Sequence, residues 1–155
     1  MIKLVRTNSN NSDFVALVKQ LDAYLKITDG DEHDFYNQFN AIENLKYVVV
    51  AYSDKKSIGC GAFKPFNDSK AEIKRMYTLT EERQKGIAKL ILKELETWAF
   101  ELGYTHTILE TGKRQVEAVS FYKKCNYVSI PKYGQYKAME NSLCFEKKLL
   151  NNEKR

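Results

Sequence analysis

Apolar and polar residues alternate over residues 71–78, which is the pattern of a strand with one buried face. Residues 80–85 are polar, and from Ile87 onward apolar residues recur at helical spacing. These residues share one face of a helix and are Ile87, Ile91, Leu95, Trp98 and Leu102. The same pattern leaves four charged residues facing water, namely Lys89, Lys93, Glu94 and Glu96. The stretch 71–102 therefore predicts a strand, a short turn and a long helix.

Similar patterns predict further elements on both sides of this stretch. Strands are expected at 2–6, 47–52, 58–63, 105–111, 127–130 and 143–145. A helix with Phe14, Val18, Leu21 and Leu25 on one face should begin at Asn10, Asn11 or Ser12 and end near Gly30, and a shorter helix should span 115–124. Short turns predict an antiparallel meander in the first half, whereas strands 71–78 and 105–111, joined by a helix, should be parallel. We therefore expect one α/β (α+β) domain over residues 1–155, with a frayed tail at its end.

Composition narrows the class of protein. The chain has 155 residues, of which 43% are hydrophobic and 29% charged, as in a globular domain. Its net charge of +5 favours small anionic partners but is too small and too evenly spread to indicate nucleic acid binding. No apolar run approaches the ~18 residues of a membrane span, and the charged start does not resemble a signal peptide, so we expect a cytoplasmic protein.

Cysteine, histidine and glycine spacing argues against several kinds of site. Cys60, Cys125 and Cys144 form no CxxC pair, and His33 and His106 are not spaced as metal ligands. We therefore expect neither a disulfide framework nor a metal site. Gly59-x-Gly61 follows a strand but lacks the third glycine and the helix of a dinucleotide-binding motif.

The turn before the long helix is suited to binding an anion. The first N–H groups of a helix have no intrahelical partner, and the helix dipole places positive potential there. Arg83, Lys85 and Lys89 add side-chain charge at the same end, and Gly86 has no Cβ to block a close approach. An ordinary basic turn exposed to solvent would have the same pattern.

Two motifs distinguish these alternatives. Residues 83–88, Arg-Gln-Lys-Gly-Ile-Ala, match the signature R/Q-x-x-G-x-G/A in the required strand–turn–helix context. Downstream, the pattern N-x-x-A-x-x-x-Y-x-x-x-G-F is matched by Gln115, Ala118, Tyr122, Asn126 and Tyr127, with Gln for Asn, Asn for Gly and Tyr for Phe. Through these motifs the chain resembles the GNAT superfamily of N-acetyltransferases. Thr78, Thr80 and Ala88 replace the common Val, Pro and second Gly, at positions where the family uses the main chain.

The resemblance implies a GNAT-like, mostly antiparallel sheet of about six to seven strands with helices on both faces. Two parallel strands would splay apart to hold acetyl-CoA as a co-substrate. The resemblance places the pantetheine arm along 76–78 and the pyrophosphate at 83–89. The cofactor-binding residues that it implies are Met76, Tyr77, Thr78, Arg83, Gln84, Lys85, Gly86, Ile87, Ala88, Lys89, Gln115 and Tyr122.

The resemblance also implies catalytic residues. Tyr122 matches the family tyrosine near the CoA sulfur, and a phenol can donate a proton to a departing thiolate. Glu72 resembles a family glutamate that acts as a base through water, although pairing with Lys74 or Arg75 is an equal alternative. The N–H group of Met76 or Tyr77 would stabilise the oxyanion. Cys125 has no histidine beside it in sequence, so we expect it to pack rather than react.

We therefore expect an acetyl-CoA-dependent N-acetyltransferase that acts directly on a primary amine of a small molecule, peptide or protein. It would be a monomer or homodimer without metal, nucleic acid or membrane partners. The alternative is a non-catalytic acyl-CoA-binding or sensing module. Acceptor contacts are expected from 29–39 and 131–141, unless the acids there simply lie on an exposed helix. The candidates are Asp31, Glu32, Asp34, Phe35 and Tyr36, with Tyr133, Tyr136 and Glu140 on the other side.

Overall fold

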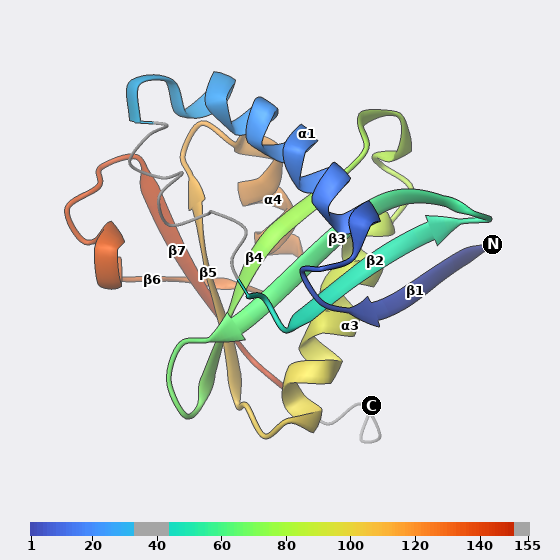
Figure 1. Ribbon diagram of the computed structural model, residues 1–155. Coiled ribbons are helices and arrows are strands. Elements are labelled where there is room, and N and C mark those ends of the chain that lie inside the picture. The colour runs from blue at the N-terminus through green and yellow to red at the C-terminus, as the bar shows by residue number, and fades with distance from the viewer. Residues whose placement is uncertain (33–43, 151–155) are drawn as a thin grey trace.

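The structure, a computed structural model, describes residues 1–32 and 44–150 (Figure 1). Within these residues a seven-stranded sheet has the order β1-β2-β3-β4-β5-β7-β6. The strands are β1 (Ile2–Thr7), β2 (Tyr47–Ser53), β3 (Lys56–Pro65), β4 (Lys70–Thr78), β5 (His106–Gly112), β6 (Val128–Ile130) and β7 (Ser142–Lys148). Neighbouring strands are antiparallel except β4 and β5, which are parallel. The predicted mixed sheet is confirmed.

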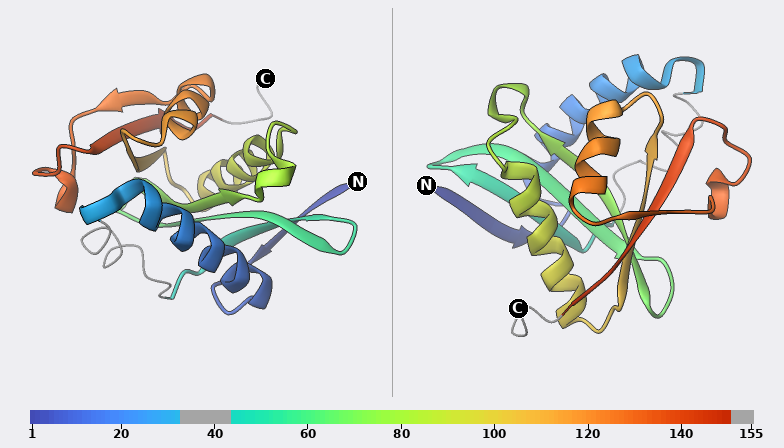
Figure 2. Two further views of the ribbon diagram at one scale, coloured as in Figure 1. Left: turned by 90° about the horizontal axis from the view of Figure 1, so that it is seen from above. Right: turned by 180° about the vertical axis from the view of Figure 1, so that it is seen from behind.

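Helices cover both faces of this sheet, as predicted. They are α1 (Ser12–Asp29), α3 (Ile87–Glu101) and α4 (Val116–Lys124). Figure 2 shows α1 on one face and α3 and α4 on the other. Helix α1 begins where the sequence placed its cap, because the Asn11 side chain accepts a hydrogen bond from the N–H of Phe14.

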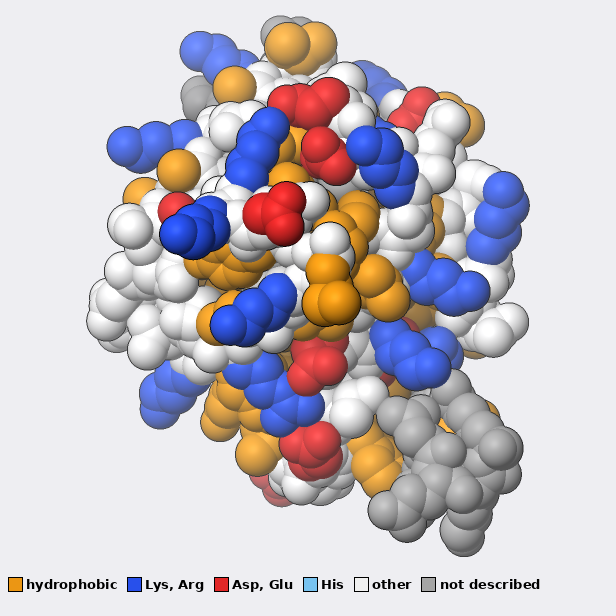
Figure 3. All heavy atoms as spheres, turned by 90° about the vertical axis from the view of Figure 1, so that its right-hand side faces the viewer, with side chains coloured by type: hydrophobic (Ala, Val, Ile, Leu, Met, Phe, Trp, Pro, Cys, Tyr) orange, Lys and Arg blue, Asp and Glu red, His pale blue; other side chains and the backbone are white. Residues whose placement is uncertain are grey.

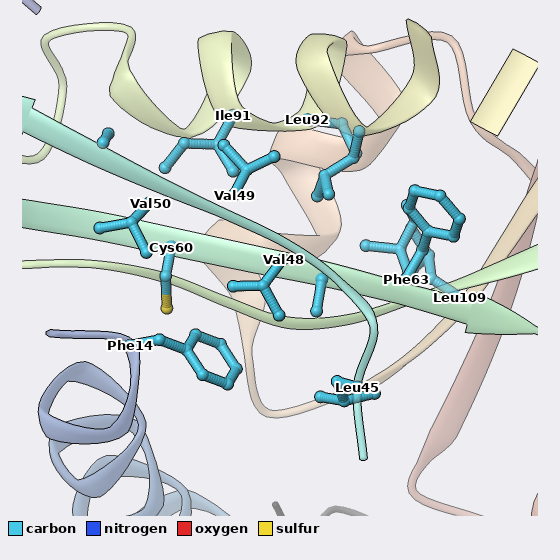
Figure 4. Close-up of a cluster of buried hydrophobic side chains, with 14 of the residues drawn as sticks. Phe14, Leu45, Val48, Val49, Val50, Cys60, Phe63, Ile91, Leu92 and Leu109 are labelled. Atoms are coloured by element: carbon cyan, nitrogen blue, oxygen red, sulfur yellow. The ribbon is translucent and has the colours of Figure 1, made fainter. Parts of the chain in front are cut away.

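The core has two sides because successive side chains of the central strands point to opposite faces of the sheet. Val49 of β2 lies toward Ile91 of α3, whereas Val48 of β2 and Cys60 of β3 lie toward Phe14 of α1 (Figure 4). All five side chains are fully buried. Helices α1 and α3 thus pack on opposite faces of the β2–β3 hairpin.

Two glycines in β3 allow α3 to pack closely on the sheet. A Cβ atom at Gly61 would lie 2.5 Å from Sδ of Met76 and 2.8 Å from Cδ1 of Leu95. A Cβ atom at Gly59 would lie 3.0 Å from Cδ1 of Ile91. Distances below about 3 Å cannot be accommodated without movement. The Gly-x-Gly pair therefore serves helix–sheet packing.

Two predictions about α3 are wrong. Glu96, expected to face water, is only 9% exposed. Its carboxylate accepts hydrogen bonds from Nζ of Lys147 at 3.0 Å and from the hydroxyl of Tyr127 at 2.8 Å. Partners from distant parts of the chain make burial of this charge possible, and the local pattern does not reveal them. Leu102, expected on the buried face, is 47% exposed because it is the C-cap at the end of the helix.

The surface carries both signs of charge. Figure 3 shows Lys and Arg side chains interspersed with Asp and Glu on the face that forms the right-hand side of Figure 1. This face therefore lacks the continuous basic stripe that a nucleic acid backbone requires. None of the helices within the described residues combines the length and apolar character needed to cross a membrane.

Candidate active site

The parallel strands β4 and β5 are paired at one end only. Their ladder joins residues 70–72 to residues 106–108. Beyond Glu72, β4 stays with β3 and β5 stays with β7, so the two strands diverge (Figure 1). Main-chain groups along one edge of the second half of β4 therefore have no neighbouring strand. Such an edge can form hydrogen bonds with a ligand.

A bulge in β4 changes which side chains face the gap. Two residues of β4, Arg75 and Met76, oppose the single residue Gly61 of β3. Arg75 has φ 60°, a left-handed conformation that is uncommon for a residue other than glycine. Its side chain extends toward α1, where Nη1 donates a hydrogen bond to Oδ1 of Asp22 at 2.7 Å. Bulges of this kind redirect side chains next to functional sites.

The turn from β4 to α3 leaves the start of the helix open. It contains the 3₁₀ turn η2 (Thr80–Glu82) and two residues with positive φ, Gln84 at 64° and Gly86 at 80°. A Cβ atom at Gly86 would have no neighbour within 4 Å, and no side chain caps α3. The N–H groups of the first helical turn therefore remain available to an anion, as predicted from the sequence.

Two of the basic side chains expected to add charge to this end have other contacts. Nε of Arg83 donates to the carbonyl of Thr78 at 3.1 Å, and its guanidinium lies over the rings of Tyr24 and Tyr77, 5.6 and 5.8 Å from their centroids. Lys85 pairs with Glu82 at 3.3 Å. The open donors at the helix start are therefore main-chain groups rather than these two side chains.

A cleft of about 90 Å³ lies where β4 and β5 part. It is lined by residues of α1, β4, β5 and α4 and by Gln115, which directly precedes α4. The lining residues are Leu21, Leu25, Ile73, Lys74, Arg75, Met76, Glu110, Gly112, Gln115 and Tyr122. The fold thus brings together three residues that the sequence proposed for the site, Met76, Gln115 and Tyr122.

Three charged residues in this lining were not predicted as site residues. Lys74 and Arg75 are adjacent charged residues in a strand that otherwise alternates, and this break in the alternation is a local signal for the bulge. Glu110 lies in the strand expected at 105–111, where its pattern marks it only as a strand residue. Their grouping depends on the pairing of β4 with β5.

Tyr122 lies on the α4 side of the cleft and is 7% exposed. Its ring packs edge-on against Phe121 and Tyr127. Burial raises the pKa of the Tyr122 phenol above its ordinary value of 10.0, and the neighbouring Cys125 contributes in the same direction. The hydroxyl therefore stays protonated at neutral pH and is able to donate a proton or a hydrogen bond.

Glu72 lies at the closed end of the gap, where β4 is still paired with β5. It accepts a hydrogen bond from the hydroxyl of Tyr133 at 2.8 Å, and Nζ of Lys74 lies 4.0 Å from the same carboxylate oxygen. Burial raises the pKa of Tyr133, and the negative charge of Glu72 adds to this effect. Burial lowers the pKa of Lys74, whereas the charge of Glu72 acts in the opposite direction. The described lining of the cleft includes Lys74 but not Glu72. The role of Glu72 as a base stays a prediction.

The loop 131–141, predicted to contribute to the acceptor pocket, packs beside this group. The rings of Tyr133 and Tyr136 meet edge-on, and the hydroxyl of Tyr136 accepts a hydrogen bond from Nζ of Lys74 at 3.4 Å. Glu140 is exposed. On the other side, His33, Asp34, Phe35 and Tyr36 lie outside the described residues.

Groups that could support other chemistry are placed elsewhere. Nδ1 of His106 lies 2.8 Å from Oγ1 of Thr105, at the start of β5. Burial raises the pKa of the Cys125 thiol, which disfavours the reactive thiolate. In the ranges 1–32 and 44–150, no group of three or more His, Cys, Asp or Glu side chains is arranged to hold a metal ion.

The elements around the cleft correspond to a known family. Residues 14–127, which include most of α1 and all of β4, α3 and α4, match the family model described as "Acetyltransferase (GNAT) family". The chain belongs to this GNAT family. It is therefore an acyltransferase, and the sequence-based expectation of family and enzyme class is confirmed.

Individual relatives agree with the family assignment. This GNAT chain is 27% identical over 155 residues to the IAA acetyltransferase of Azospirillum brasilense, a match that covers 96% of this chain and 98% of the relative. It is 31% identical over 90 residues to the uncharacterized N-acetyltransferase YjcF of Bacillus subtilis, a match that covers 58% of this chain and 61% of that protein.

Solved structures share the fold. A Klebsiella pneumoniae protein named as an acyl-CoA N-acyltransferase superposes with a TM-score of 0.81 at 24% identity, covering 97% of this GNAT chain and 99% of the other. A GNAT acetyltransferase of Elizabethkingia anophelis, solved with acetyl-CoA bound, gives 0.68 at 15% identity, with 96% and 98% covered. The PaiA N-acetyltransferase of Thermoplasma acidophilum, solved with coenzyme A, gives 0.71 at 20% identity, with 96% and 99% covered.

Proposed function

We propose that this GNAT protein transfers an acetyl group from acetyl-CoA directly to a primary amine. One observation carries the proposal: the unpaired edge of β4 runs from a cleft lined by the buried, protonated Tyr122 to the turn before the uncapped start of α3. Neighbours with the same fold were solved with acetyl-CoA or coenzyme A, which supports this choice of donor.

The residues fit acetyl-CoA. Open space at Gly86 and the free N–H groups of α3 suit the pyrophosphate, which we assign to residues 83–89. The unpaired edge of β4 suits the amide groups of the pantetheine arm, which we assign to residues 76–78. Gln115 and Tyr122 would complete the site from α4 and the residue before it. Acetyl-CoA supplies an activated thioester whose thiol is the leaving group.

The chain's own residues would then donate and accept the protons of the reaction. Tyr122 donates a proton to the departing thiolate, for which burial keeps its phenol neutral. The N–H group of Met76 or Tyr77 stabilises the developing oxyanion. The amine proton passes to Glu72 through water, or to Glu110, the carboxylate that lines the cleft itself. Holding the amine beside the thioester provides the remaining acceleration.

A non-catalytic acyl-CoA-binding module would use the same cofactor contacts. It would not require the buried charged side chains on the α1 side of the cleft, which carry a desolvation cost. Their presence favours the enzyme. We also propose that residues 1–155 act as one domain, in the cytoplasm, as a monomer or homodimer; the continuous sheet supports the first of these points.

Calorimetric titration with acetyl-CoA and the release of free CoA thiol in the presence of varied amines test the proposal. Binding with turnover is expected; binding without turnover of any amine would favour the sensing module, and no binding would overturn both. Gly86→Leu should weaken acetyl-CoA binding, because the side chain fills the open space at the helix start. Gly103→Leu is the matched control, since Gly103 also has positive φ and open space but lies at the far end of α3. Equal affinities of the two variants would refute the pyrophosphate assignment.

A further inference from the structure

Arg75 carries a guanidinium that is only partly satisfied. Its side chain is 3% exposed, and Nη1 donates to Oδ1 of Asp22 at 2.7 Å. Nη2 is buried and has no hydrogen-bond partner within the described part of the chain. A buried donor on a charged group is costly to leave unpaired, and an anionic oxygen that reaches it gains a strong hydrogen bond. The cost of this arrangement suggests that Arg75 is kept for a ligand.

The position of Arg75 separates this ligand from the phosphates of the donor. Arg75 lines the cleft together with Leu21 and Leu25 of α1, and its fixed partner Asp22 also belongs to α1. Helix α3, whose start we assign to the pyrophosphate, lies on the opposite face of the sheet (Figure 2). An anion at Nη2 would therefore belong to the molecule that enters from the α1 side, which is the acceptor.

The charges of the cleft are complementary to a zwitterion. The consecutive residues Lys74 and Arg75 both line the cleft, next to the bulge in β4. Glu110 of β5 adds a carboxylate to the lining. A guanidinium binds a carboxylate in a planar, forked geometry. A carboxylate side chain attracts an ammonium group. The cleft volume of about 90 Å³ admits small groups rather than a folded chain segment.

We propose that the acceptor is a free amino acid with an apolar side chain, whose carboxylate binds Nη2 of Arg75, whose amino group faces Glu110 and whose side chain lies against Leu21 and Leu25. This inference rests on the acetyltransferase function proposed above. The thioester C–S bond breaks and an amide C–N bond forms. The bound ammonium group first releases one proton to solvent, the neutral amine loses a second to a carboxylate of the site as the amide forms, and the thiolate takes one from Tyr122. The products are an N-acetyl amino acid and CoA.

Matched substrates test the inference on the unaltered protein. CoA release is measured with leucine and leucinamide, and with phenylalanine and phenylalaninamide, at saturating acetyl-CoA. The amide of each pair has the same side chain and a less basic amine, so more of it is in the reactive neutral form. Despite that advantage, we expect kcat/KM for the free acid to be higher by about 10- to 100-fold, the loss typical of a missing hydrogen bond to a charged group. Equal or higher values for the amides would overturn the inference.

Two variants separate carboxylate binding from a structural role of the Arg75–Asp22 pair. Arg75→Gln breaks the pair and removes the charged donors; it should lower the ratio of leucine to leucinamide kcat/KM about 10- to 100-fold, mainly through KM for leucine. Asp22→Asn weakens the same pair but leaves the guanidinium, so the ratio should stay at or above that of the unaltered protein. If the ratio of leucine to leucinamide kcat/KM falls in both variants, or in neither, the inference is overturned.

Failure of the inference is distinguishable from failure of the proposed function. A protein that binds no acetyl-CoA refutes the proposed function. A protein that binds acetyl-CoA and acetylates amines without regard to a carboxylate supports the function and overturns the inference. A protein that binds acetyl-CoA but acetylates neither member of any pair also overturns the inference.

Discussion

Replacement of Glu96 by leucine should destabilise the protein strongly, although the residue lies on a helix far from any cap. Glu96 and Lys147 have side chains that are only 11% and 16% exposed, with Nζ and Oε1 3.0 Å apart. In Glu96→Leu the ammonium group of Lys147 keeps its buried position but loses its counter-charge. Tyr127 is less affected, because its hydroxyl lies 2.8 Å from Oγ1 of Thr107 as well.

The expected loss of unfolding free energy follows from the buried Lys147 charge that is left without a counter-charge. Removing one partner of a buried ion pair costs about 3–5 kcal/mol, and the slight exposure of both groups places this pair near the lower end. A loss of about 3 kcal/mol should lower Tm by about 6–12 °C in a domain of this size. In Glu96→Leu/Lys147→Met neither charge of this pair remains, so the double variant should recover most of the loss.

Urea unfolding followed by circular dichroism measures these differences, with Tm from calorimetry as a second readout. Glu101→Gln is the matched control, because Glu101 is also an α3 glutamate in an ion pair, with Arg6, but is well exposed. Its unfolding midpoint should not change measurably. If the double variant is as unstable as Glu96→Leu, an unpaired Lys147 is not the cause of the loss and the reasoning is refuted.

Three further outcomes are expected. Tyr122→Phe should lower kcat by about 10²–10⁴-fold while the Kd for acetyl-CoA, from calorimetry, stays nearly unchanged; a comparable loss of both would place Tyr122 in binding instead. Gly61→Ala should destabilise the protein by about 1–3 kcal/mol in urea unfolding, because its Cβ would lie 2.5–2.8 Å from Met76 and Leu95; unchanged stability would show that α3 moves away freely. Burial raises the pKa of the Cys60 thiol from 9.0 to about 12, so its contribution to stability is complete below pH 9 and is lost as the pH rises toward 12. Cys60→Ala should therefore flatten the fall in unfolding free energy between pH 9 and pH 12, and an unaltered slope would contradict this assignment.

Several elements of the cofactor region could be predicted locally. The alternation over 71–78 and the helical spacing from Ile87 correspond to β4 and α3. The candidate cap at Asn11 does cap α1, and the glycine at position 86 adopts a positive φ at the start of α3. These features depend on residues a few positions apart, and the turn chemistry of a single segment determines them.

The α1 side of the cleft could not be predicted in this way. Lys74 and Arg75 looked like possible surface partners of Glu72 on an ordinary strand. Their place in the cleft depends on a bulge opposite Gly61, on the separation of β4 from β5 and on Asp22, which is far away in the sequence. Glu96 was predicted wrongly for the same reason, since Lys147 and Tyr127 reach it from other elements.

The order of elements, the helix start that suits an anion and the tyrosine that lines the cleft could all be recognised in the amino-acid sequence alone. These are encoded in periodicity, in glycine and cap positions and in short motifs, all of which act over one or two turns of chain. Which charges are buried, and what they face, depends on the three-dimensional fold. Burial of a charge depends on partners that distant segments supply, and a local pattern of polar residues cannot distinguish a solvated lysine or arginine from one enclosed beside a cleft.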